Sequence, residues 1–458
     1  MKRRTLRILS IILTVVMFIT VQSGCKNDTP EDIETPPVET LPPPVITPTP
    51  TPTPTPEDVI IPFEERTELI FGARYVHPSI RPAVTKFNET SGTHRITIVD
   101  YSHYDSHEND WMGSIDQLAL EIAEGTAPDI IDVSSVPYVQ WAARGEFVNL
   151  YPLIDADPEI NRSDFIESII KTVEVNGGLY QAFDSFGINT IIGSSSILGE
   201  DTQWTLSELT SVIGRNRRAN WPLGFQSKDD ILRDFIIMNA NDFIDWTSGT
   251  AQFDSSEFTE LLKFANTFPK DWPGYNDPIW NQNLISTGRQ IMQLLPFYYF
   301  NHSAGDLREL IGDDIVFKGY PVETGFGNIV NIESGLAITA GCEEIDAAWE
   351  FLRMFLTQEG QRERIYAGTH LMPVNKVVFD EEMSQELEDP VGGINQYEAD
   401  NIIAMVNSVT RLSYSGPRAI EDIIRENAKE FFDRRITVTE AARRIQTGVT
   451  DYLEEQRG

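Results

Sequence analysis

Residues 122–133 read IAEGTAPDIIDV and join the end of a helix to a buried strand. Apolar residues at 115–122 recur at helical spacing, and Gly125 ends that helix. Pro128 then precedes the run 129–133, whose branched apolar residues favour a buried strand. A helix that leads directly into an apolar strand is typical of α/β proteins with a parallel sheet.

The sequence before this stretch repeats the same pattern. Residues 68–71 and 95–99 predict two further strands, and residues 78–87 predict a helix between them. The alternation therefore predicts an α/β fold with mostly parallel sheets. Ligands bind such sheets beyond the carboxyl ends of the strands, which gives three candidate loops: 75–77, 101–107 and 134–138.

The C-terminal region predicts two amphipathic helices. One apolar stripe runs from Ile420 to Phe432, and a second runs from Ala442 to Leu453. Thr437 or Thr439 can cap the second helix. Both stripes are interpreted as core, without a functional signal.

Composition excludes several classes of protein. The formal net charge of −34 over 458 residues argues against binding nucleic acid, because such a protein needs a basic face. Two cysteines cannot form a disulfide framework, and the length allows two or three domains. The sequence contains no G-x-S-x-G, H-E-x-x-H, P-loop or dinucleotide motif, so we expect neither an enzyme nor a cofactor.

The N-terminus has the pattern of a targeting segment. Four basic residues lie within 1–7, an apolar run spans 8–21, and Ser23-Gly24 precedes Cys25. This is a secretory signal, too short for a spanning helix. It resembles a bacterial lipoprotein signal (1–24), which implies a lipid on Cys25. Gln22 departs from the aliphatic residue usual there, so ordinary secretion stays open.

A Pro- and Thr-rich segment separates this signal from the globular sequence. Prolines recur through 29–58, which favours an extended polyproline-like spacer. We assign 25–64 to the lipid anchor and linker. With Cys25 lipidated, Cys342 is the remaining thiol, and we expect it to be buried or half-exposed without a catalytic role.

One loop is dense in potential metal ligands. Residues 101–110 read YSHYDSHEND, and histidines with carboxylates can bind a divalent cation. The spacing matches no defined metal loop, including the calcium hand. We therefore interpret it as a solvated or ligand-rim loop and predict no metal site.

Several segments, taken in order, resemble a known family. They are IAEGTAPDIIDV (122–133), NGGLYQAFDSFGIN (176–189), QWTLSEL (203–209), GRQIM (288–292), AAWEFLRMFLTQEGQ (347–361) and MPVNK (372–376). Together they resemble the extracellular solute-binding proteins of ABC importers, in the carbohydrate-binding group. The resemblance covers about 67–455 and departs from the family at 182–184, where Ala-Phe-Asp replaces a usual Leu-Pro.

The resemblance implies a periplasmic-binding-protein-like fold with two hinge-linked lobes. Lobe one would comprise 65–184 plus 292–344, and lobe two 188–291 plus 346–458. It also implies a carbohydrate ligand, most simply an oligosaccharide, and delivery to the permease subunits of an importer. We expect a monomer outside the cytoplasm, held to the outer face of the cytoplasmic membrane by its N-terminal lipid.

A sugar site needs planar aromatic rings for the C–H face and hydrogen-bonding groups for the hydroxyls. The parallel-sheet argument supplies Tyr75, His77, Ser134 and Tyr138. The crossing and return segments of the family supply Asp184, Phe186, Tyr298 and Tyr299. Polar loops add four further candidates: Trp246, Trp280, Glu333 and Arg418, although the first two are as easily packing residues and Arg418 a surface charge.

The sequence is also compatible with two other functions. A receptor that presents its ligand to a membrane sensor kinase would have the same sequence features. A cell-surface glycosidase would need a carboxylate pair, and among 70 acidic residues some pair always resembles one.

Overall fold

The computed structural model describes residues 61–107, 112–274, 277–281, 283–300, 308, 311–312, 314–366, 371–389 and 393–455. All of them belong to one compact unit, Asp58–Gly458. The predicted signal, Cys25 and most of the linker lie outside the described residues.

The first sheet has the strand order β10-β3-β1-β2. Strand β1 (Thr67–Ala73) pairs in parallel with β2 (His94–Asp100) and with β3 (Ile130–Asp132). Strand β10 (Leu336–Ile338) is antiparallel to β3. The three predicted strands are confirmed, and so are the helices α1 (Ile80–Thr90) and α2 (Gly113–Glu124). Gly125 ends α2 in the left-handed region, at φ 70°.

Helices cover both faces of this sheet. On one face, α1 and α11 (Ile345–Arg353) share a core cluster in which Phe71 packs edge-on against Phe351 at 6.3 Å. On the other face, α2 and α3 (Tyr138–Arg144) enclose Ile131 and Trp141. Side chains alternate between the faces because successive strand residues point in opposite directions.

The second sheet is built around β4 (Ser185–Ser194). Strand β4 is antiparallel to β7 (Gln293–Phe297), β8 (Ile315–Phe317), β9 (Ile329–Asn331) and β11 (Met372–Pro373). Strand β12 (Arg411–Leu412) pairs in parallel with β9. The second sheet is therefore largely antiparallel, unlike the parallel arrangement expected from the sequence.

One face of the second sheet packs against α7 (Leu206–Arg215), α8 (Lys228–Ile231), the π-helix η4 (Leu232–Ile237), α9 (Ser256–Ala265), α15 (Arg418–Phe432) and α16 (Val438–Glu455). The two predicted C-terminal stripes are buried there, as expected. Thr437 caps α16, since its Oγ1 accepts the amide of Glu440 at 3.2 Å.

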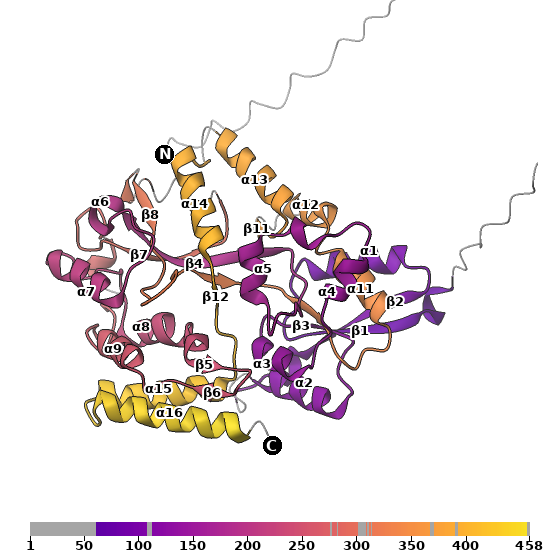
Figure 1. Cartoon of the computed structure of the whole chain (residues 1–458), viewed down its shortest axis with the longest axis horizontal. Coiled ribbons are helices and arrows are strands. Elements are labelled where there is room, and N and C mark those ends of the chain that lie inside the picture. Colours follow the sequence, from indigo (N-terminus) through magenta and orange to yellow (C-terminus); the bar gives the residue numbers. More distant parts are fainter. Residues whose placement is uncertain are drawn as a thin grey trace, which may run out of the picture. The chain divides into compact units, whose positions relative to one another are not determined.

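The other face packs against α5 (Glu167–Val173), α13 (Lys376–Glu388) and α14 (Gln396–Ser408). In Figure 1, α13 and α14 lie on the opposite side of β4 from α15 and α16. The same cluster includes Phe71, Phe183 and Phe186 and so runs continuously from the first sheet to the second. The remaining elements are η1 (Phe63–Glu65), η2 (Tyr101–Tyr104), α4 (Tyr151–Ala156), η3 (Arg162–Asp164), α6 (Ser195–Leu198), η5 (Ala240–Phe243), β5 (Ile244–Asp245), β6 (Thr250–Ala251), η6 (Pro278–Asn281) and α12 (Gln358–Tyr366).

The strand pairing changes the expected lobe boundaries. The sequence interpretation placed 292–344 in lobe one, but β7, β8 and β9 all pair in the second sheet. The chain returns to the first sheet at 332–335, between Asn331 of β9 and Leu336 of β10. Helix α11, expected in lobe two, packs on the first sheet through Phe351.

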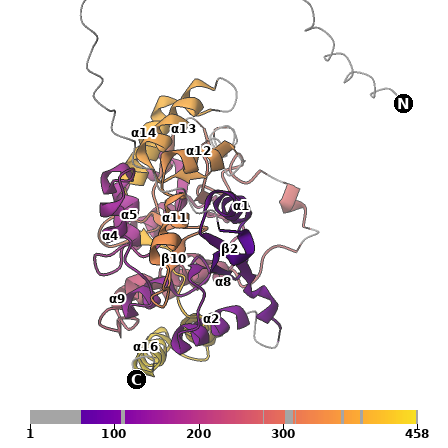
Figure 2. The ribbon, with the colours of Figure 1, turned by 90° about the vertical axis from the view of Figure 1, so that its right-hand side faces the viewer.

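The C-terminal end of α16 lies beside α2, on the far side of the molecule from α13 and α14 (Figures 1 and 2). Burial of Tyr452 there raises its pKa, and its hydroxyl hydrogen-bonds Gln140 of α3. Among the described residues, no helix combines the length and apolar character that crossing a bilayer requires.

Candidate functional site

A cavity of about 100 Å³ lies between the two sheets. From the first-sheet side it is lined by the end of β3, the start of α3 and Gln181. From the second-sheet side it is lined by the end of β9 and by the segment that follows β12. The lining residues are Val133, Ser134, Tyr138, Gln181, Asn331, Ile332, Leu412, Ser413, Tyr414 and Ser415. Two predicted site residues, Ser134 and Tyr138, are among them.

Two larger cavities lie elsewhere. One of about 800 Å³ separates α1 from α12, and one of about 710 Å³ lies over α7 and α9. Neither is lined by a predicted site residue. We favour the smaller cavity because it combines residues of both sheets at the carboxyl end of a parallel strand, where α/β folds bind ligands.

Asp132 is the buried carboxylate behind this cavity. It ends β3 with 5% of its surface exposed. Oδ1 accepts the Ser134 amide at 2.9 Å, and Oδ2 accepts the Ser334 hydroxyl at 3.2 Å. Burial raises the pKa of Asp132, and these hydrogen bonds oppose the shift only in part. Sequence reasoning missed this residue, although an acid inside an Ile-rich strand was a visible signal.

The loop after β1 contributes His77 and Tyr75. His77 Nδ1 accepts the Ser79 amide at 3.3 Å and lies 2.7 Å from the Ser79 hydroxyl. Burial raises the pKa of Asp132, and a charge on His77 would act against that shift. Tyr75 is 58% exposed, with the Arg74 guanidinium 5.1 Å from its ring centre. It projects into solvent at the edge of the loop.

Tyr138 forms part of the cavity wall. Its hydroxyl donates to the carbonyl of Val173 at 2.9 Å, and 2% of its surface is exposed. Burial raises the pKa of Tyr138 well beyond its usual range. The ring is therefore fixed by the protein.

The second sheet brings Tyr298, Asn331 and Glu333 together. The Asn331 amide donates to the Tyr298 hydroxyl at 3.0 Å. Burial first, and then the charge of Glu333, raises the pKa of Tyr298. The Tyr298 ring lies directly over Gly187, where any Cβ would collide with it. Tyr299 lies next to this group, with its ring centre 6.4 Å from that of Tyr298.

Trp246 contacts Tyr414, one of the residues that line the cavity. Its ring stacks on Tyr414 at 6.4 Å, and its Nε1 donates to Asn241 Oδ1 at 2.9 Å. Arg418 is the first residue of α15, and its Nε is 3.6 Å from Oδ2 of Asp422. Trp280 belongs to η6, and its side chain lies outside the described residues.

Phe186 and Asp184 are not among the residues that line the cavity. Phe186 is 1% exposed and stacks on Phe379 at 6.4 Å, because it lies on the face of β4 that packs against α13. Asp184 forms an ion pair with Arg364 and accepts the Ser185 hydroxyl at 2.6 Å. Phe186 is thus a packing residue and Asp184 an ion-pair residue in this structure, and a ligand contact by either stays a prediction.

The loop rich in histidine and acid is partly structural. Asp105 accepts Arg74 Nε at 2.8 Å and the Ser114 amide at 2.8 Å, so it holds the start of α2. Residues 108–110 lie outside the described residues. In the part of the chain that the structure describes, no group of three His, Cys, Asp or Glu side chains could hold a metal ion. Cys342 is buried, which raises the pKa of its thiol to about 12.

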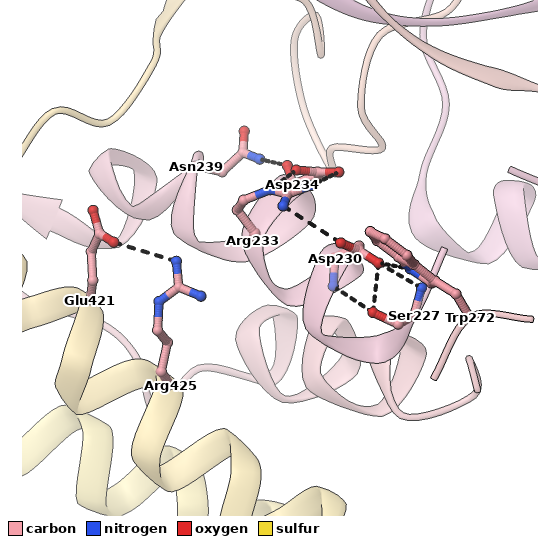
Figure 3. A network of polar contacts seen from close by, with 8 residues as sticks. All are labelled: Ser227, Asp230, Arg233, Asp234, Asn239, Trp272, Glu421 and Arg425. Carbon is pink, nitrogen blue, oxygen red and sulfur yellow. Dashed lines mark hydrogen bonds and ion pairs between the residues drawn. The ribbon is translucent and has the colours of Figure 1, made fainter. Parts of the chain in front are cut away.

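A second polar network lies away from the cavity, among α8, η4 and the 272 loop (Figure 3). One oxygen of Asp230 accepts both the Ser227 hydroxyl and Trp272 Nε1 at 2.6 Å. Asn239 donates to the carbonyls of Asp234 and Phe235 at 3.2 Å. These bonds satisfy the ends of α8 and the π-helix, which indicates a structural role.

Comparisons with known proteins identify a family and structures of similar fold. The family described as bacterial extracellular solute-binding protein matches residues 83–390. No match was found among curated proteins.

Three solved structures illustrate the similarity. The sugar-binding protein MalE from Xanthomonas citri is 14% identical with a TM-score of 0.57, over 85% of this chain and 98% of that one. A designed cysteine esterase is 12% identical with a TM-score of 0.56, over 86% and 100%. A cyclic alpha-maltosyl-1,6-maltose binding protein from Arthrobacter globiformis is 14% identical with a TM-score of 0.54, over 85% and 100%. At these identities the similarity shows the two-lobed fold.

Proposed function

This chain belongs to the bacterial extracellular solute-binding proteins, and on that premise we propose that it captures a carbohydrate between its lobes and delivers it to the permease subunits of an ABC importer. The observation that carries the proposal is the cavity lined from both sheets. A ligand that contacts both lobes favours the closed arrangement and so shifts the population toward it.

The lining favours a neutral, hydroxyl-rich ligand. Its polar side chains are hydroxyls and amides, from Ser134, Gln181, Asn331, Ser413 and Ser415. Such groups both donate and accept, as sugar hydroxyls require. Tyr414 adds an aromatic surface of the kind that packs on a sugar ring. The names of the similar sugar-binding proteins support the same class of ligand.

Calorimetric titration of the full chain with sugars tests the proposal. The panel runs from D-tagatose to maltose and longer maltooligosaccharides, so that it also tests the expectation of an oligosaccharide. Asn331→Ala removes a cavity amide and should weaken binding by about tenfold. Asn401→Ala, on α14 away from the cavity, is the matched control and should bind normally. The proposal fails if no sugar binds at millimolar concentration.

We propose in addition that Cys25 carries the lipid that holds the protein at the outer face of the membrane. The support is the sequence pattern of a basic end, an apolar run and Ser23-Gly24 before the cysteine. Cys25→Ser should move the protein from the membrane fraction to the soluble fraction. Cys342→Ser, the control at the buried thiol, should leave it with the membrane. Ordinary secretion would instead give soluble protein before either change.

A further inference from the structure

Arg364 of α12 contacts Asp184, which lies in the first segment that crosses between the two sheets. Its Nε forms an ion pair with Oδ2 of Asp184, and the two side chains are 11% and 14% exposed. The guanidinium lies 3.7 Å from the centre of the Phe355 ring and donates to the carbonyl of Met354 at 3.0 Å. Three different contacts therefore fix the position of this cation.

Asp184 lies where the chain passes from one sheet to the other. Two residues earlier, Ala182 forms a bridge to Leu336 of the first sheet. The next residue, Ser185, begins β4 and pairs with Pro373 of β11. The carbonyl of Asp184 also accepts the amide of Val374 at 3.0 Å. Both its side chain and its backbone are thus held at the junction.

Lobe movement in a hinged protein concentrates its backbone changes in a few crossing residues. We propose that Arg364 is a positioning residue of this hinge, which fixes Asp184 and thereby the register in which β4 pairs with β11 where the chain enters the second sheet. Without the guanidinium, the Asp184 carboxylate in its present position would be a buried charge without a cation, which is strongly unfavourable. The carboxylate would therefore turn toward solvent and loosen the hydrogen bond between Val374 and Asp184.

This role is distinct from the ligand-binding role that the sequence suggested for Asp184. Only the link from hinge geometry to ligand capture rests on the proposed function. The hinge geometry itself can be measured without any sugar.

The chain contains a second pair of arginine and aspartate, which includes no crossing residue. Arg353 of α11 binds Asp157 at 2.7 Å, with side chains 27% and 4% exposed. Asp157 also accepts Trp349 Nε1 at 3.1 Å. Arg353→Met therefore breaks an arginine–aspartate pair within lobe one, together with the Arg353–Glu159 pair at 2.7 Å, and reports the effect of lost stability.

Hydrogen–deuterium exchange of the full chain tests the proposal. Arg364→Met should speed exchange of the Val374 amide by about tenfold or more, because its local opening becomes easier. Arg364→Lys keeps the charge and should restore part of the protection. Arg353→Met should lower the unfolding midpoint and leave the Val374 amide as protected as in the unmodified chain.

If Arg364→Met fails to fold, Asp184→Asn is the second variant, because it removes the charge and keeps the shape. It should expose the same amide to a smaller degree. The proposal is overturned if the Val374 amide is unchanged, or if Arg364→Met and Arg353→Met speed exchange equally throughout the chain. A sugar panel that shows no binding would leave the exchange result intact, so the two proposals fail separately.

Discussion

Asp132 shows how one residue can be unfavourable for folding and still have a defined role. An ionised carboxylate with 5% exposure loses most of its hydration, and burial accordingly raises its pKa. Its two oxygens nevertheless connect the end of β3 to Ser134 and to Ser334 of the second crossing. The same carboxylate thus holds both the cavity wall and a hinge segment.

We predict that the stability conferred by Asp132 falls as pH rises. The pKa of Asp132 in the folded chain lies above its unfolded value of about 3.9. Between these two pKa values the unfolded chain ionises first, which stabilises it relative to the folded chain. Asp132→Asn should therefore unfold at a higher temperature than the unmodified chain at pH 7. Its free energy of unfolding should be larger by about 1.4 kcal/mol for each unit of pKa shift.

Thermal melts from pH 3 to pH 8 provide the measurement. The advantage of Asp132→Asn should vanish below the ordinary pKa of the carboxyl group, where both chains are neutral at this position. Asp380→Asn, on the exposed face of α13, should follow the unmodified chain at every pH. An advantage for Asp132→Asn that is independent of pH would contradict the assignment.

The two predicted residues that line the cavity are ones that a local sequence rule can place. Ser134 and Tyr138 follow a buried strand in a parallel sheet, and the carboxyl-end rule places such residues at a cavity. Asp184 has a partner, Arg364, that no local pattern could reveal, since the two meet only through the fold. Asn331 likewise reaches the cavity through a strand pairing distant in sequence.

Elements with a strong local period could be predicted from the sequence. Strands β1 to β3 and helices α15 and α16 combine several apolar residues at one spacing. Helix α7 is capped by Thr205, whose hydroxyl accepts the Glu208 amide at 3.2 Å while Oε2 of Glu208 accepts the Thr205 amide at 2.7 Å.

Short strands carry no comparable signal. Strands β11 and β12 have two residues each, and β8 and β9 have three. No period can be read from so few positions, and their pairing with β4 or β9 is decided by tertiary contacts. Without such a pattern, the sequence predicts that the chain returns to the first sheet near Met292. The strand pairing instead places this return at 332–335.

At the scale of the whole molecule, the lobes are connected in two different ways. One core cluster runs continuously past β4 and stabilises the hinge side. On another side, two polar contacts also connect the lobes: Thr247 donates to Asn176 Oδ1 at 2.7 Å, and the Tyr452 hydroxyl and Gln140 form a hydrogen bond. A single hydrogen bond of this kind contributes little to stability, so these two suit contacts that must break and re-form.

These polar contacts should bias the equilibrium between open and closed lobes. Thr247→Ala with Tyr452→Phe removes both, and at about 0.5–1.5 kcal/mol each the ratio of closed to open molecules should fall severalfold to about a hundredfold. Small-angle X-ray scattering should then give a larger radius of gyration, and sugars should bind more weakly because fewer molecules are closed. Tyr397→Phe, an exposed tyrosine on α14, is the control and should change neither quantity. An unchanged radius of gyration in the double variant would mean that the continuous core alone determines how far the lobes open.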